Sequence, residues 1–176
     1  MHCVSTLQKN YNILFIVTDQ ERYLESHPVG TSWCARELLQ SIGATFEKHY
    51  ISSNMSTPSR SVIYTGQHIT STMMSDNTDV PWQNALCVSI PTMGHKLRSA
   101  GYYTAYKGKF HLSNYGAMKI PGAESNQDSE IKPSDQLEVY GFSDWNCEGE
   151  IAGGMLDGFY KDDYISSSAI RWHREK

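Results

Sequence analysis

The sequence predicts an α/β fold with a mixed, largely parallel sheet flanked by helices. Three observations support this prediction. Residues 13–17 (Ile-Leu-Phe-Ile-Val) are apolar on both faces of an extended segment, as in a strand covered by helices on both sides. Segments with helical spacing alternate with short apolar segments along the chain. A polar cluster at 18–22 directly follows the first strand, where such folds commonly place a ligand.

Helices and strands are expected to alternate along most of the chain. They are a strand at 12–17, a helix at 33–42, a strand at 44–51, helices at 58–65 and 91–100, a strand at 102–106 and a helix at 162–174. Gly43, Gly66 and Gly101 mark the ends of three of these helices, because glycine readily adopts the conformation that terminates a helix. Pro58 and Pro91 suit a first helical turn, where a missing N–H is tolerated.

The region 113–143 is rich in Gly, Pro, Asn and Asp, so we expect it to be mostly loop. Three strands are few for a sheet whose first strand needs neighbours on both sides. The last helix has an apolar face with Ile165, Ala169 and Trp172, and this face also needs a partner. We therefore expect residues 1–176 to form a domain that is incomplete at its C-terminus.

Composition narrows the classes of partner. The chain has a net charge of −4 and 19% charged residues, so nothing favours nucleic acid or an anionic membrane. No leader pattern is visible at the N-terminus, and we expect a cytoplasmic location. The four cysteines are widely spaced: Cys3, Cys34, Cys87 and Cys147. We expect free thiols, and two disulfides are the alternative.

Residues 56–60, Ser-Thr-Pro-Ser-Arg, lie at the start of a predicted helix. A hydroxyl at Ser56 would sit where backbone N–H groups and the helix dipole favour an anion. Arg60, one turn further along, offers a planar fork of donors suited to an oxyanion. The alternative is that Ser56 only caps the helix and that Arg60 is solvated.

The segment 56–66 resembles the sulfatase signature, which is Cys or Ser, any residue, Pro, Ser or Ala, Arg, and then a helix ending in Thr-Gly. Residues 12–19, 43–46 and 101–111 resemble three further blocks of that family, in the same order. The resemblance covers about 11–112 and implies that 1–176 is the N-terminal part of a sulfatase catalytic domain with an alkaline phosphatase-like fold.

The resemblance implies a role for each matching residue. Ser56 would be converted by a maturation enzyme to formylglycine, the nucleophile that attacks the sulfur of a sulfate ester. Arg60 would hold this nucleophile, and Lys109 and His111 would contact the sulfate and the leaving oxygen. Without the family, Lys109 would be interpreted as a surface lysine and His111 as a loop histidine.

The resemblance also implies a divalent metal, usually Ca²⁺, bound by Asp19, Gln20 and the nucleophile at position 56. Oxygen ligands of this kind suit a hard cation. Gln20, where many relatives have a second acid, resembles the branch with choline sulfatases and phosphonate monoester hydrolases. The remaining metal ligands of the family, with a further Lys and His, would lie beyond Lys176, so this chain alone is expected to be inactive.

Two substitutions depart from the commoner family pattern. Ser56 stands where Cys is commoner; some bacterial members mature such a serine with a radical enzyme, and an engineered Cys-to-Ser change is the alternative. Phe110 replaces Trp at an apolar packing position.

The expected substrate is a small-molecule or saccharide sulfate ester. A phosphoester or phosphonate hydrolase of the same superfamily, or a catalytically silent anion-binding fragment, remain the alternatives.

Overall fold

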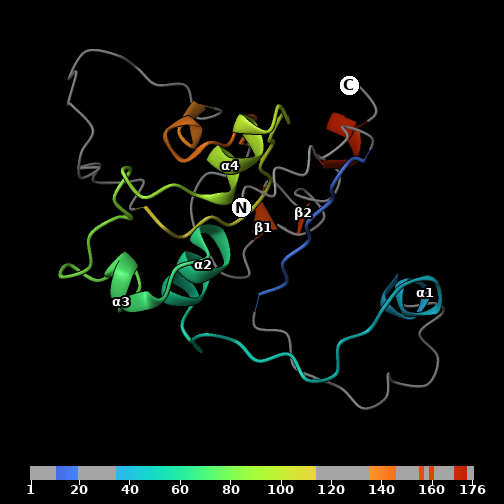
Figure 1. Cartoon of the computed structure of the whole chain (residues 1–176), viewed down its shortest axis with the longest axis horizontal. Helices are drawn as coiled ribbons and strands as arrows, with labels where there is room; N and C mark the ends of the chain where they lie inside the picture. The colour runs from blue at the N-terminus through green and yellow to red at the C-terminus, as the bar shows by residue number, and fades with distance from the viewer. Residues whose placement is uncertain are drawn as a thin grey trace, which may run out of the picture. The chain divides into compact units, whose positions relative to one another are not determined.

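The computed structural model of the chain describes residues 11–19, 35–113, 135–145, 155–156, 159–160 and 169–173. The chain divides into two compact units, residues 1–51 and 52–176. The elements are α1 (Ala35–Ile42), α2 (Ser56–Thr65), α3 (Ile69–Thr72), α4 (Met93–Ser99), the 3₁₀ helix η2 (Glu138–Tyr140), β1 (Met155–Leu156) and β2 (Phe159–Tyr160) (Figure 1).

In the first unit, α1 confirms the predicted helix at 33–42 over its described part, and Gly43 follows its last residue. The predicted strands at 12–17 and 44–51 are not formed. Both segments are described as irregular chain, and their apolar side chains are exposed, with Leu14 83% and Tyr50 83% accessible. A strand exists only when a neighbouring strand accepts its hydrogen bonds, and the described residues of this unit include no such neighbour.

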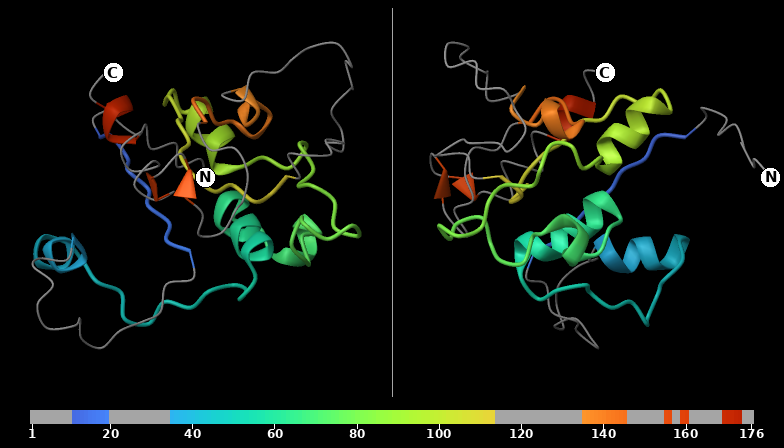
Figure 2. Two further views of the ribbon diagram at one scale, coloured as in Figure 1. Left: turned by 180° about the vertical axis from the view of Figure 1, so that it is seen from behind. Right: turned by 60° about the vertical axis from the view of Figure 1, so that its left-hand side comes forward.

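In the second unit, α2 confirms the predicted helix at 58–65 and begins two residues earlier, at Ser56. It ends at Gly66, which has a φ of 67° and donates its N–H to Val62 O. Few residues other than glycine adopt this left-handed conformation without strain. The short helix α3 packs beside α2 (Figures 1 and 2).

Helix α4 confirms the helix predicted at 91–100. Thr92 and His95 form a capping box at its start. The Thr92 side chain accepts a backbone N–H of the first turn, and the His95 ring accepts the N–H of Thr92. Gly101, with a φ of 86°, follows the helix as predicted. The next segment, 102–106, is not a regular strand. Among the described residues it makes one isolated parallel bridge, Ala105 to Ser143.

Of the region predicted to be mostly loop, 113–143, the structure describes residue 113 and residues 135–143, and the latter are turns with one short 3₁₀ helix. Residues 135–145 include η2, and Leu137 and Tyr140 are fully buried. The Tyr140 hydroxyl donates to Leu86 O at 2.9 Å, and burial raises the pKa of Tyr140. Composition did not reveal this burial, because the apolar residues at 137, 140, 142 and 145 are separated by polar neighbours.

Nine buried side chains from the described ranges form a core in the second unit. They are Tyr64, Met74, Leu86, Phe110, Leu112, Leu137, Tyr140, Phe142 and Trp145. Phe110 is central, with its ring centroid 5.7 Å from Tyr64, 5.0 Å from Tyr140 and 6.2 Å from Phe142. The Trp-to-Phe departure therefore falls at a fully buried aromatic position.

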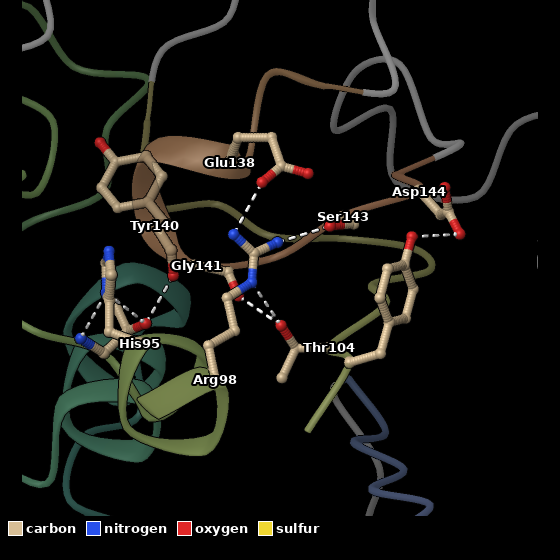
Figure 3. A network of polar contacts seen from close by, with 10 residues as sticks. His95, Arg98, Thr104, Glu138, Tyr140, Gly141, Ser143 and Asp144 are labelled. Carbon is tan, nitrogen blue, oxygen red and sulfur yellow. Dashed lines mark hydrogen bonds and ion pairs between the residues drawn. The ribbon is translucent and has the colours of Figure 1, made fainter. Parts of the chain in front are cut away.

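A polar network centred on Arg98 ties α4 to the chain around it (Figure 3). The Arg98 guanidinium donates to Thr104 Oγ1 at 2.9 Å, Glu138 Oε2 at 2.7 Å and Ser143 Oγ at 2.5 Å. The hydrogen bond from Arg98 lowers the pKa of Glu138. One side chain thus joins α4, η2 and the bridged segment.

Strands β1 and β2 form an antiparallel pair, with Met155 opposite Tyr160 and Leu156 opposite Phe159. In the sequence, Asp-Gly separates these strands, and this dipeptide is a strong hairpin signal that the prediction missed. The predicted, largely parallel sheet is not seen in the described residues. Residues 169–173 are helical, in agreement with the predicted last helix, whose earlier part lies outside the described residues. No helix among the described residues has the length and apolarity needed to cross a membrane.

The backbone of α4 approaches the turn after η2 so closely that only glycine fits at either side. A Cβ added at Gly94 would lie 2.5 Å from Gly141 O and 2.9 Å from Phe142 Cε1. We predict that Gly94→Ala lowers the free energy of unfolding by about 1–3 kcal/mol, because backbone must move to make room. Urea denaturation would measure this loss. Lys96→Ala, at an exposed position of the same helix, should change stability by less than about 0.5 kcal/mol; equal losses would contradict the prediction.

Candidate active site

The start of α2 brings a serine hydroxyl next to a lysine. Ser56 is the first residue of the helix, and the cap position belongs to Met55, whose side chain makes no capping hydrogen bond. Ser56 is therefore not the helix cap, which was the alternative interpretation. Its Oγ lies 3.3 Å from Lys109 Nζ, which donates to it. Both side chains are half-buried, so the cation acts in a partly dehydrated setting.

The backbone contributes less to anion binding here than the sequence predicts. Pro58 has no N–H. The N–H of Thr57 donates to Asn77 Oδ1 at 3.1 Å, and that of Ser59 donates to Met55 O at 3.1 Å. These first-turn donors are already used within the protein, so the Lys109 ammonium is the clearest positive group at the Ser56 hydroxyl.

Arg60 faces inward rather than into solvent. Its side chain is 5% exposed, and its Nη1 donates to Lys109 O at 2.6 Å and to the Tyr64 hydroxyl at 3.2 Å. The alternative of a solvated Arg60 is therefore wrong. The Arg60 guanidinium thus holds the main chain of Lys109, and the Lys109 side chain reaches Ser56.

Thr57 fixes the other end of the same segment. Its buried hydroxyl donates to His111 O at 2.7 Å and accepts the N–H of Thr78 at 3.3 Å. Lys109 and His111 thus both present their carbonyl groups to α2. This arrangement docks the segment against the turn that carries Ser56.

His111 is 5% exposed and has a φ of 56°. A non-glycine residue in this region is uncommon and is often found at functional sites. Its Nε2 lies 3.9 Å from Asp79 Oδ1. Because His111 is left-handed, residues 109–111 are not regularly extended, and the simple alternation expected of a strand end does not apply to them.

Within the second unit, Lys109 meets Ser56 through its side chain and Arg60 through its carbonyl group, and His111 is joined to α2 through its carbonyl group. Asp19, the predicted metal ligand, belongs to the first unit and is exposed. Gln20 lies outside the described residues. Within the described ranges, no three His, Cys, Asp or Glu side chains gather as a metal site would need. The metal site remains a prediction.

Five contacting residues were not singled out from the sequence. They are Thr57, Tyr64, Asn77, Asp79 and Tyr106. Tyr64 had a usable signal, since it follows Arg60 by one helical turn. Asn77 and Asp79 lie in a loop that the Gln83 side chain holds, with Oε1 accepting the N–H groups of Ser75 and Asp76. No local pattern marks such a loop as part of a site.

Comparison with known proteins gives consistent results. The family described as Sulfatase matches residues 11–175. The chain is 38% identical over 117 residues to a choline-sulfatase of Rhizobium meliloti (strain 1021), covering 66% of this chain and 20% of that protein. It is 31% identical over 114 residues to the uncharacterized sulfatase YidJ of Escherichia coli (strain K12), covering 61% and 21%.

A putative extracellular sulfatase Sulf-1 homolog of Caenorhabditis elegans is 25% identical over 171 residues, covering 94% of this chain and 23% of that protein. The chain therefore spans about a fifth of the length of the curated relatives it matches. No solved structure matches it.

The Thr57 hydroxyl can be tested without any assay of activity. Thr57→Val keeps the shape but leaves His111 O and the Thr78 N–H without this partner. We predict a loss of about 2 kcal/mol in the free energy of unfolding, measured by urea denaturation. Thr57→Ser keeps the hydroxyl and loses one methyl group, so it should lose about 1 kcal/mol or less. A serine variant as unstable as the valine variant would contradict the assigned hydrogen bonds.

Proposed function

This chain belongs to the sulfatase family, and we propose that it forms part of an enzyme that hydrolyses sulfuric esters through a nucleophile at position 56. The observation that carries the proposal is the hydrogen bond from Lys109 Nζ to Ser56 Oγ, 3.3 Å long, at the first turn of α2. Two residues that the signature blocks place 53 positions apart meet here, as a shared reaction centre requires.

Lys109, Arg60 and His111 each have a distinct proposed role. The Lys109 ammonium stabilises negative charge on the group at position 56 and on the sulfate oxygens, since charge near 3 Å in a partly dehydrated site interacts strongly. Arg60 keeps Lys109 in place through its carbonyl oxygen. His111, buried and close to Asp79, is the proposed proton donor to the leaving oxygen.

Formylglycine at position 56 would, when present, supply two geminal hydroxyl groups, one for attack on sulfur and one for release of the sulfate. Asp19 and Gln20 offer a carboxylate and an amide oxygen, which suit a hard divalent cation such as Ca²⁺ in kind. Such a cation would offset negative charge on the transferred group. We propose both groups for the complete enzyme.

We propose a small-molecule or saccharide sulfate ester as substrate. The similarity to a choline-sulfatase favours a small ester. A phosphonate or phosphoester substrate is the second candidate, because Gln20 resembles the branch that also holds phosphonate monoester hydrolases.

The state of Ser56 is directly measurable. Co-expression with a radical maturation enzyme is predicted to yield a peptide containing residue 56 that lacks two hydrogen atoms relative to serine. Tandem mass spectrometry would place the loss at Ser56 rather than Ser59. The Ser56→Ala variant should show no loss. An intact serine in every preparation would contradict the formylglycine nucleophile.

The choice of ester is also measurable. The complete matured enzyme should hydrolyse an aryl sulfate faster than an aryl phosphonate monoester. Lys109→Ala should lower kcat/KM for the sulfate by about 100-fold or more, as for other preorganised charge-stabilising groups. Lys96→Ala, at an exposed position of α4, is the control and should leave the rate unchanged. Sulfate turnover no faster than background would remove the proposed activity.

A further inference from the structure

Two tyrosine hydroxyl groups complete a closed ring of hydrogen bonds behind the candidate site. The Tyr64 and Tyr106 hydroxyl oxygens are 2.5 Å apart. Tyr106 donates to Lys109 O at 2.6 Å, and Arg60 Nη1 donates to the same oxygen at 2.6 Å. Arg60 Nη1 also donates to the Tyr64 hydroxyl at 3.2 Å. The ring therefore runs from Arg60 to Tyr64, to Tyr106, to Lys109 and back.

The protons of this ring can be assigned by counting. Tyr106 has one hydroxyl proton, and it is given to Lys109 O. The short contact between the tyrosines must then be filled by the Tyr64 proton, with Tyr106 accepting. Tyr64 accepts in turn from Arg60, whose Nη1 has two protons, one for Tyr64 and one for Lys109 O. The three bonds from Arg60 through Tyr64 and Tyr106 to Lys109 O run in one direction, so each polarises the next, and the fourth bond joins Arg60 Nη1 directly to the same oxygen.

Packing holds the ring rigidly. Tyr64 is 2% exposed, and its ring stacks on Phe110 with an interplanar angle of 8°. Tyr106 meets Phe110 edge-on, with centroids 5.5 Å apart. Phe110 lies between Lys109 and His111 in the chain. The tyrosines thus contact the segment at two places: a hydrogen bond reaches the Lys109 carbonyl, and both aromatic rings pack on Phe110.

We propose that Tyr64 and Tyr106 are positioning residues, whose paired hydroxyl groups hold the Lys109 main chain and the Arg60 guanidinium so that Lys109 Nζ stays at Ser56. This inference rests on the proposed function for its catalytic meaning. Neither hydroxyl is placed at the reacting atoms. Both act through Arg60 and the carbonyl of Lys109.

The test uses the 176-residue chain with Ser56 left as serine. The variants are Tyr106→Phe and Tyr64→Phe, which remove one hydroxyl each and keep the aromatic packing. Tyr102→Phe removes a tyrosine hydroxyl outside the ring and is the matched control. Two quantities are measured by NMR: the separation of the two Cε proton signals of Lys109, which reports how well the side chain is held, and the affinity for inorganic sulfate.

The wild-type chain should show separated Cε proton signals for Lys109. In Tyr106→Phe and in Tyr64→Phe the separation should fall to less than about half, and sulfate should bind about threefold to tenfold more weakly, the range for one lost hydrogen bond. The double variant should lose no more than either single one, because the ring is broken once. Tyr102→Phe should match the wild type.

Unchanged Lys109 signals in both tyrosine variants, or an equal change in Tyr102→Phe, would overturn the inference. If one variant fails to fold, the other decides the question. A wild-type chain that binds no sulfate would count against the proposed function, and the Lys109 signals would still decide the positioning role. Loss of stability without any change in those signals would show that the hydroxyl groups are only structural, and would also overturn it.

Discussion

The second unit depends on how the segment 109–112 is held by its own carbonyl groups. Lys109 O accepts from Arg60, His111 O accepts from Thr57, and Leu112 O accepts from the N–H of Leu86 at 2.8 Å. These bonds attach an irregular, buried segment to α2 and to the loop before α4. Buried backbone groups must find such partners, since leaving one unpaired costs about 1–3 kcal/mol.

Local signals in the sequence were enough to predict α1, α2 and α4, whereas the short helices α3 and η2 were not predicted. Each of α1, α2 and α4 has a residue next to it in the chain that marks where the helix begins or ends. Gly66 ends α2, and Thr92 caps the start of α4. Strands are different, because their stability comes from neighbours elsewhere in the chain. The segment 102–106 has strand composition, and within the described part of the chain it forms one bridge, to Ser143. Pattern alone could not show how many neighbours each segment has.

The same division holds for the site. Ser56, Arg60, Lys109 and His111 were predicted because a signature and a second block carry them, and their roles remain predictions. The partners that orient them were missed, because Asn77 and Tyr106 lie 20 and 42 positions from the α2 residues they contact, with no shared local pattern. The metal ligands Asp19 and Gln20 remain predictions, since the first belongs to the other unit and the second lies outside the described residues.

The location of Phe110 in the centre of the core has an evolutionary consequence. Its ring is fully buried, and its two chain neighbours, Lys109 and His111, belong to the proposed site. Substitutions in the hydrophobic interior, which usually drift freely when volume is conserved, would here shift a lysine and a histidine at once. Substitutions at Tyr64, Phe110 and Phe142 should therefore be coupled, and a chimera that mixes interiors from two relatives would inherit a misaligned pair at the proposed site.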